Sequence, residues 1–210
     1  MPKPMFVWSG TQWVSVASEV ESLANFATQS YADAQPGSKL IVPTSIAVGS
    51  GSGSISTQGA VTFTSASSIS LNGCFSSTYD NYRLIWNVTS QTNSTGLVLR
   101  VRASGTDLSS STYSYGHFIN AYTTSISGDG SGSATGPVIG YSGSQNTRGI
   151  VDILNPQSTL NTYGYYWSGS ETSTFNGGFR VNNTTSYDGF TFFPQAGTFT
   201  GTLRVYGYKN

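Results

Sequence analysis

The stretch that decides the fold is residues 82–88, YRLIWNV. Apolar residues fill most of its middle, and β-branched and aromatic side chains favour strands. We therefore expect a buried central strand here. A second stretch, LVLRVR at residues 97–102, places both leucines and Val101 on one face and both arginines on the other. The polar segment between them, residues 91–96, predicts that the two strands form a hairpin.

Working outward, similar short runs recur along most of the chain, with turn signals roughly every 8–12 residues. No helical pattern interrupts them, so about ten short strands predict a mostly β protein, an antiparallel β-sandwich of the jelly-roll kind. The glycine- and serine-rich residues 125–136 predict a long loop. The further expected strands are residues 61–63, 69–71, 117–122, 137–141, 148–154, 163–167, 175–182, 189–193 and 199–208.

The N-terminal part has a different pattern. Residues 5–16 predict a hairpin whose turn contains Gly10, and the following residues predict one α-helix over 17–35, ended by Pro36 and Gly37. Apolar and small residues follow one another at alternating spacings of 3 and 4, which is typical of a heptad seam. The helix either packs on its own domain or gathers copies of the chain in a short bundle. The residues expected at an oligomer interface are Trp13, Val16, Val20, Leu23 and Ala27.

These patterns predict three parts. Residues 1–48 are an attachment and oligomerisation segment, residues 49–59 a Gly/Ser linker, and residues 60–210 the β-sandwich domain. The linker prediction rests on the GSGSG sequence at residues 49–53, which also fits a glycine-rich hairpin tip.

The composition narrows the function. The formal net charge is +0 and only 9% of residues are charged, so no basic footprint for nucleic acid or anionic lipid is expected. No apolar run has the length of a signal peptide or membrane span, which predicts synthesis in the cytoplasm without a signal peptide and no membrane insertion. The single cysteine, Cys74, excludes an intrachain disulfide.

Catalytic chemistry is not indicated. A glycosidase needs two carboxylates flanking the scissile bond, and the acidic residues are scattered, although Asp107, Asp129 and Glu171 lie in expected loops that could meet. His117 is the only histidine, and with Cys74 alone it cannot complete a metal site. We therefore expect no enzyme activity, no cofactor and no metal.

Two aromatic clusters are the candidate binding residues. Aromatic rings stack on the apolar faces of sugar rings and in protein pockets. The alternative is core packing or a subunit interface, since alternate residues of the strand at 163–167 must face inward. The candidates for receptor or glycan binding are Tyr113, Tyr115, His117, Tyr163, Tyr165 and Trp167.

Several blocks of the sequence resemble a known family. The opening VWSGTQWVSV (residues 7–16) resembles a W-x-G-x-x-W-x-x-V stretch of tail and fibre proteins of tailed bacteriophages. Residues 69–88, 97–107 and 199–210 resemble, in that order, a β domain of phage minor tail and receptor-binding proteins.

The resemblance implies a virion protein, often a homotrimer, with the β domain binding a host-surface glycan or protein. The N-terminal segment is then expected to dock on other virion proteins. The alternatives are a capsid decoration or head-fibre protein that stabilises the shell, and a polysaccharide depolymerase.

Overall fold

The computed structural model describes residues 6–8, 10–11, 13–15, 37–123, 125–141 and 145–209. The chain divides into two compact units, residues 1–37 and residues 38–210. Within the described residues all regular elements are strands, and none is a helix. The helix expected over residues 17–35 lies outside the described residues, as do the seam positions Val16, Val20, Leu23 and Ala27.

The N-terminal hairpin is present as the sequence predicts. Strands β1 (Phe6–Trp8) and β2 (Trp13–Ser15) pair antiparallel, with Trp8 opposite Trp13. Gly10 has a φ of +94°, a conformation that glycine adopts without steric cost.

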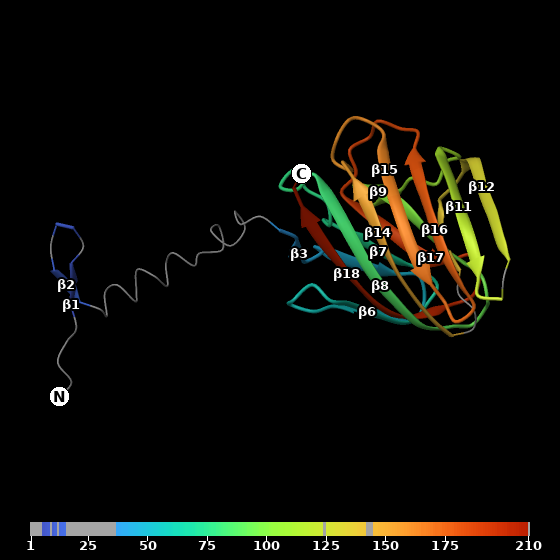
Figure 1. Ribbon diagram of the computed structural model, residues 1–210, viewed down its shortest axis with the longest axis horizontal. Helices are drawn as coiled ribbons and strands as arrows, with labels where there is room; N and C mark the ends of the chain where they lie inside the picture. Colours follow the sequence, from blue (N-terminus) through green and yellow to red (C-terminus); the bar gives the residue numbers. More distant parts are fainter. Residues whose placement is uncertain are drawn as a thin grey trace. The chain divides into compact units, whose positions relative to one another are not determined.

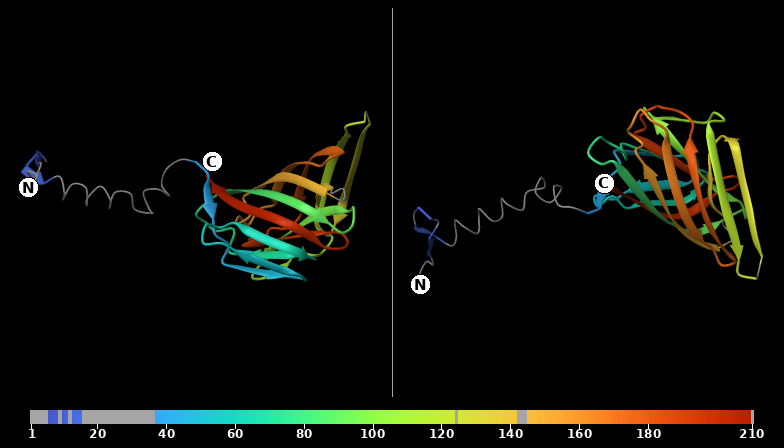
Figure 2. Two further views of the ribbon diagram at one scale, coloured as in Figure 1. Left: turned by 90° about the horizontal axis from the view of Figure 1, so that it is seen from below. Right: turned by 45° about the horizontal axis from the view of Figure 1, so that its top comes forward.

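The larger unit is built from two antiparallel sheets, seen in Figures 1 and 2. The ten-stranded sheet has the order β12-β11-β16-β15-β14-β8-β18-β6-β5, with β3 also paired to β18. Its strands are β3 (Lys39–Ile41), β5 (Ser52–Ile55), β6 (Val61–Ala66), β8 (Asn81–Gln91), β11 (Tyr113–Ala121), β12 (Ile126–Ala134), β14 (Gln145–Leu154), β15 (Thr162–Gly169), β16 (Ser173–Val181) and β18 (Phe199–Tyr208).

The six-stranded sheet has the order β10-β9-β17-β7-β4, with β13 also paired to β9. Its strands are β4 (Ser45–Val48), β7 (Ile69–Asn72), β9 (Gly96–Ala103), β10 (Thr106–Asp107), β13 (Val138–Tyr141) and β17 (Gly189–Pro194). The expectation of a mostly β, antiparallel two-sheet fold is therefore confirmed for the described residues.

Strand β8 is central, as its sequence predicts, because it lies between β14 and β18. The predicted hairpin of residues 82–88 with 97–102 is wrong. Strand β9 belongs to the other sheet and pairs with β17, so the chain crosses between sheets after β8. A polar turn marks a reversal of the chain but does not specify which strand becomes the hydrogen-bonded neighbour.

Two glycine-rich stretches are ordered strands, contrary to expectation. Residues 52–55 form β5, which pairs with β6, so the compact unit begins at residue 38 and no separate linker occupies 49–59. The glycines allow close approach: a Cβ on Gly51, whose φ is +68°, would lie 2.1 Å from the Thr64 carbonyl oxygen. Residues 126–134, expected in a loop, form β12 and pair with β11.

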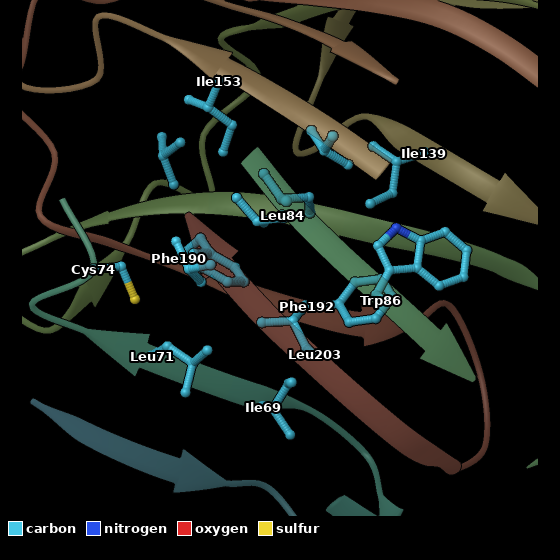
Figure 3. Close-up of a cluster of buried hydrophobic side chains, with 14 of the residues drawn as sticks. Ile69, Leu71, Cys74, Leu84, Trp86, Ile139, Ile153, Phe190, Phe192 and Leu203 are labelled. Atoms are coloured by element: carbon cyan, nitrogen blue, oxygen red, sulfur yellow. The ribbon is translucent and has the colours of Figure 1, made fainter. Parts of the chain in front are cut away.

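One hydrophobic core lies between the two sheets. Trp86 and Leu84 of β8 and Leu203 of β18 come from the ten-stranded sheet, and Phe190 and Phe192 of β17 come from the six-stranded sheet (Figure 3). The ring centroids of Trp86 and Phe192 are 5.4 Å apart. The two sheets thus contribute side chains to one shared core.

The only cysteine is part of this core. Cys74 is 1% exposed and carries a free thiol. Burial, with a smaller effect from the Asp188 carboxylate, raises the pKa of this thiol. The thiol therefore stays protonated at neutral pH, so Cys74 acts as a small apolar residue.

Candidate binding surface

A row of three aromatic side chains lies exposed on β15. Tyr163, Tyr165 and Trp167 are 44%, 60% and 56% exposed. The intervening residues point the other way, and Gly164, Tyr166 and Ser168 are buried. Residues two apart in a strand lie about 6.5–7 Å from each other on the same face. We call Tyr163, Tyr165 and Trp167 the β15 aromatic row, and the side of the ten-stranded sheet that carries it the outer face.

The neighbour on one side of the row is β14. Asp152 lies opposite Tyr165, and Ile150 lies opposite Trp167. The Asp152 carboxylate accepts two hydrogen bonds from Arg83 of β8, at 2.8 Å from Nε and 2.7 Å from Nη2. Asp152 raises the pKa of Arg83, chiefly through this hydrogen bonding. The pair fixes a charged, hydrogen-bonding rim beside the row.

The neighbour on the other side is β16. Arg180 lies opposite Tyr163, and Asn176 lies opposite Trp167. Both are exposed. A shallow hollow of about 320 Å³ is lined by Ser114, Tyr163, Tyr165 and Arg180, together with three glycines and with Tyr115 and Phe179 of the inner face. The row is thus flanked on both sides by groups that donate and accept hydrogen bonds.

A larger groove, of about 740 Å³, opens at the Trp167 end of the row. We call it the Trp167 groove. Side chains of β8, β14, β15 and β18 line it, together with Tyr122, whose backbone N–H donates to the Thr172 carbonyl at 3.0 Å. The exposed lining side chains are Ile85, Tyr122, Arg148, Trp167, Thr202 and Arg204.

Three of the six candidate residues form the row, and the other three face the opposite side of the sheet. Tyr113 is fully buried, its hydroxyl accepting from the Val101 N–H at 3.0 Å and donating to the Leu108 carbonyl at 3.1 Å. His117 is 6% exposed, and its ring stacks on that of Tyr115 at 5.8 Å. The proposal of Tyr113 and His117 as surface binding residues is therefore wrong.

His117 instead belongs to a buried aromatic cluster. Its Nδ1 lies 3.2 Å from the Tyr166 hydroxyl, and its ring centroid lies 5.4 Å from that of Phe175. Burial lowers the pKa of His117, and the Asp129 carboxylate opposes part of this effect. His117 is thus a buried strand residue whose ring contacts neighbouring aromatic side chains, which agrees with the alternative of core packing.

Sequence reasoning missed other exposed residues on this sheet. Phe118, Tyr122 and Ile126 are 67%, 59% and 73% exposed. The two arginines of the Trp167 groove were also missed. The alternation around residues 117–122 was the available signal, but its phase is ambiguous because His117 and Phe118 are both compatible with either face.

Two acidic residues of the described chain are held in ion pairs. Asp107 is ion-paired with the largely buried Arg102, and Asp152 is paired with Arg83. Arg100 makes no such pair; it donates to the Thr135 carbonyl at 2.8 Å and lies over the Phe193 ring. No group of three or more His, Cys, Asp or Glu side chains placed to hold a metal ion occurs among the described residues. No helix long and apolar enough to cross a membrane occurs there either.

Comparison with known proteins adds little to this geometry. No protein-family description matches the chain, and no curated protein matches it. Among solved structures, domain 4 of AbnA, an extracellular GH43 arabinanase of Geobacillus stearothermophilus in complex with arabinotriose, matches with 16% identity. The match covers 78% of this chain and 82% of that chain, with a TM-score of 0.32. At this TM-score the likeness carries no argument about fold or function.

Proposed function

We propose that this chain is a bacteriophage virion protein of the tail-fibre or receptor-binding class. Its ten-stranded sheet contacts a glycan of the host surface with its outer face. The observation that carries the contact is the β15 aromatic row, three large rings held at regular spacing on a rigid strand. The virion assignment rests on the sequence resemblance to phage tail proteins.

The chemistry of the row suits a sugar chain. Aromatic faces stack on the C–H faces of sugar rings, while nearby polar groups bind the hydroxyls. The ladders of β14 and β16 hold the row, and Asp152, Arg83, Asn176 and Arg180 provide polar groups beside it. A preformed surface loses little conformational entropy on binding, which favours its use as an adhesive site.

We also propose that the two-sheet fold is of the jelly-roll kind, which suits a virion protein. Strands β6, β7, β8 and β9 alternate between the two sheets, and so do β16, β17 and β18. Jelly rolls have this alternation and occur in viral capsid and lectin domains. The β14–β15–β16 meander then takes the place of a single strand.

The oligomeric part of the proposal rests on the heptad spacing of Trp13, Val16, Val20, Leu23 and Ala27 and on the phage resemblance. The chain forms a homotrimer through residues 13–37, and its N-terminal segment attaches to other virion proteins. In this proposal the protein binds without catalysis, and two of its few carboxylates, Asp107 and Asp152, are held in ion pairs.

The test measures binding of the full chain to host surface polysaccharide. Replacing Tyr165 and Trp167 together with alanine removes two stacking platforms, and we expect binding at least about tenfold weaker. Val42→Ala is the matched control, because Val42 is also exposed, at 49%, and lines neither the row nor the hollows beside it. Unchanged binding in the double variant refutes the role of the row.

The location in the virion needs a separate measurement. A tail-tip protein is present in a few copies per particle, whereas a shell decoration is present in tens to hundreds. If an antibody against residues 38–210 leaves adsorption of the particle intact, and if the copy number is in the tens to hundreds, the protein is a capsid decoration instead.

A further inference from the structure

The lining of the Trp167 groove carries positive charge without negative charge. Two arginines, Arg148 and Arg204, are among its lining residues, and no acidic residue is. The chain as a whole has formal net charge +0, with nine basic and nine acidic residues. A groove that gathers two cations without a carboxylate is therefore a local positive field in a neutral protein.

Both guanidinium groups are available to a ligand. Arg148 is exposed and donates from Nε to the Asn87 side-chain oxygen at 3.2 Å, a neutral partner that leaves its charge uncompensated. Arg204 is exposed, and no carboxylate of the described residues pairs with it. By contrast, Arg83 and Arg102 are each paired with an aspartate.

The strand register brings the two arginines toward one another. Arg148 of β14 lies opposite Asn87 of β8, and Arg204 of β18 lies opposite Ile85 of the same strand. The Arg148 side chain extends from β14 to Asn87 of β8, the strand that lies between β14 and β18. The two charges therefore flank the apolar outer surface of β8, where Ile85 is 44% exposed.

Aromatic rings form the other end of the groove. Trp167 and Tyr122 are both more than half exposed and both line it. A Cβ on Gly169 would lie 3.9 Å from the Tyr122 hydroxyl, so the tyrosine leans over the end of β15 where a side chain is absent. A ring-shaped ligand that stacks on Trp167 thus has cationic groups beyond it across β14 and β8.

We propose that the Trp167 groove binds an acidic saccharide, in which a sugar ring stacks on Trp167 and a carboxylate, as in a uronic acid, is bound by Arg148 and Arg204. The guanidinium fork matches the two oxygens of a carboxylate. This inference rests on the proposed function and specifies the ligand class of the same surface.

A nucleic acid is a poorer fit for the same groove. Single-stranded nucleic acids also stack on aromatic side chains, but their binding sites follow the backbone with many cations. The Trp167 groove has two arginines, and the carboxylate of one sugar binds both of them.

The experiment compares two ligands that share one sugar chain and differ in whether the carboxyl groups are charged or capped with a methyl group. Calorimetric titration of the full chain with a galacturonic acid oligomer and with its methyl ester, at low salt, isolates the contribution of the carboxylate. We expect the acid to bind about tenfold more tightly than the ester, and added salt to reduce the difference.

The variants test the two arginines. In the double variant Arg148→Gln and Arg204→Gln the acid and the ester bind alike, because the cationic partners are gone. Lys209→Gln is the control: it changes the net charge in the same direction at an exposed residue outside the groove, and the preference for the acid persists.

Several results overturn the inference. Equal binding of the acid and the ester refutes the acidic-saccharide inference. The proposed function is then kept, with a neutral host glycan as the ligand. Failure of both probes also refutes it, and the separate test of Tyr165 and Trp167 on host polysaccharide then decides the proposed function. Tighter binding of a glycerol phosphate oligomer assigns the groove to a phosphate-bearing polymer, and tighter binding of oligothymidylate assigns it to nucleic acid.

Discussion

Two tryptophans of the ten-stranded sheet have opposite environments. Trp86 on β8 is 2% exposed, and Trp167 on β15 is 56% exposed. Their strands are separated only by β14, where Gly149 lies opposite Trp86 and Ile150 lies opposite Trp167. Neighbouring residues of β14 face opposite sides of the sheet, so one tryptophan enters the core and the other enters the outer face.

The difference separates stability from binding. Trp86 packs on Phe192 of the other sheet and close to Gly149, where a Cβ would lie 2.5 Å from the indole ring. Trp167 has Ile150 and Asn176 as lateral neighbours on the outer face. The inner aromatic residues thus join the two sheets, while the outer ones are exposed and are the groups that we propose to contact a partner.

The largest expected effect comes from the inner tryptophan. Trp86→Ala should lower the free energy of unfolding by about 3–5 kcal/mol, since a large side chain leaves a cavity between two sheets. Trp86→Phe should cost less, because it keeps a ring against Phe192 and because Trp86 Nε1 has no hydrogen-bond partner among the described residues. Denaturant unfolding measures both. A loss below about 1 kcal/mol for the alanine variant contradicts the assigned core.

A smaller, pH-dependent effect is expected from His117 on the inner face. Burial lowers its pKa, so as the pH falls below about 6.5 the unfolded chain binds a proton that the folded chain resists. Stability should therefore decrease with falling pH through this group. The variant His117→Gln lacks this titration. The difference in the free energy of unfolding between the natural chain and the variant should therefore become smaller as the pH is lowered from about 7.5 to 5.5. A constant difference across this range refutes the buried neutral histidine.

The smallest effect on stability is expected on the outer face. Trp167→Ala and Tyr165→Ala should each change the free energy of unfolding by less than about 1 kcal/mol, the usual range for cross-strand pairs on an exposed face. The same thermal or denaturant unfolding measures them. A loss of unfolding free energy as large as that of Trp86→Ala would show that the row is buried in an assembly of the chain. The row would then be a subunit interface and not a binding surface.

Some features were predictable because they depend on neighbouring residues in the chain. The N-terminal hairpin, the central position of β8 and the mostly β character follow from alternation and turn residues. The candidate site was only half predictable. Tyr163, Tyr165 and Trp167 are equally consistent with the core and the surface until the phase of β15 is known, whereas Tyr113 and His117 face inward.

The sequence by itself determined where most of the strands run, because period-two alternation and glycine turns are local properties of the chain. Only the tertiary structure decided that β8 and β9 belong to different sheets, that residues 52–55 and 126–134 are strands, and that Arg148, Arg204 and Trp167 share a groove. Strand pairing joins residues far apart in sequence, and a shift of one residue in register exchanges the two faces. Which tryptophan is buried therefore depends on the partners of each strand.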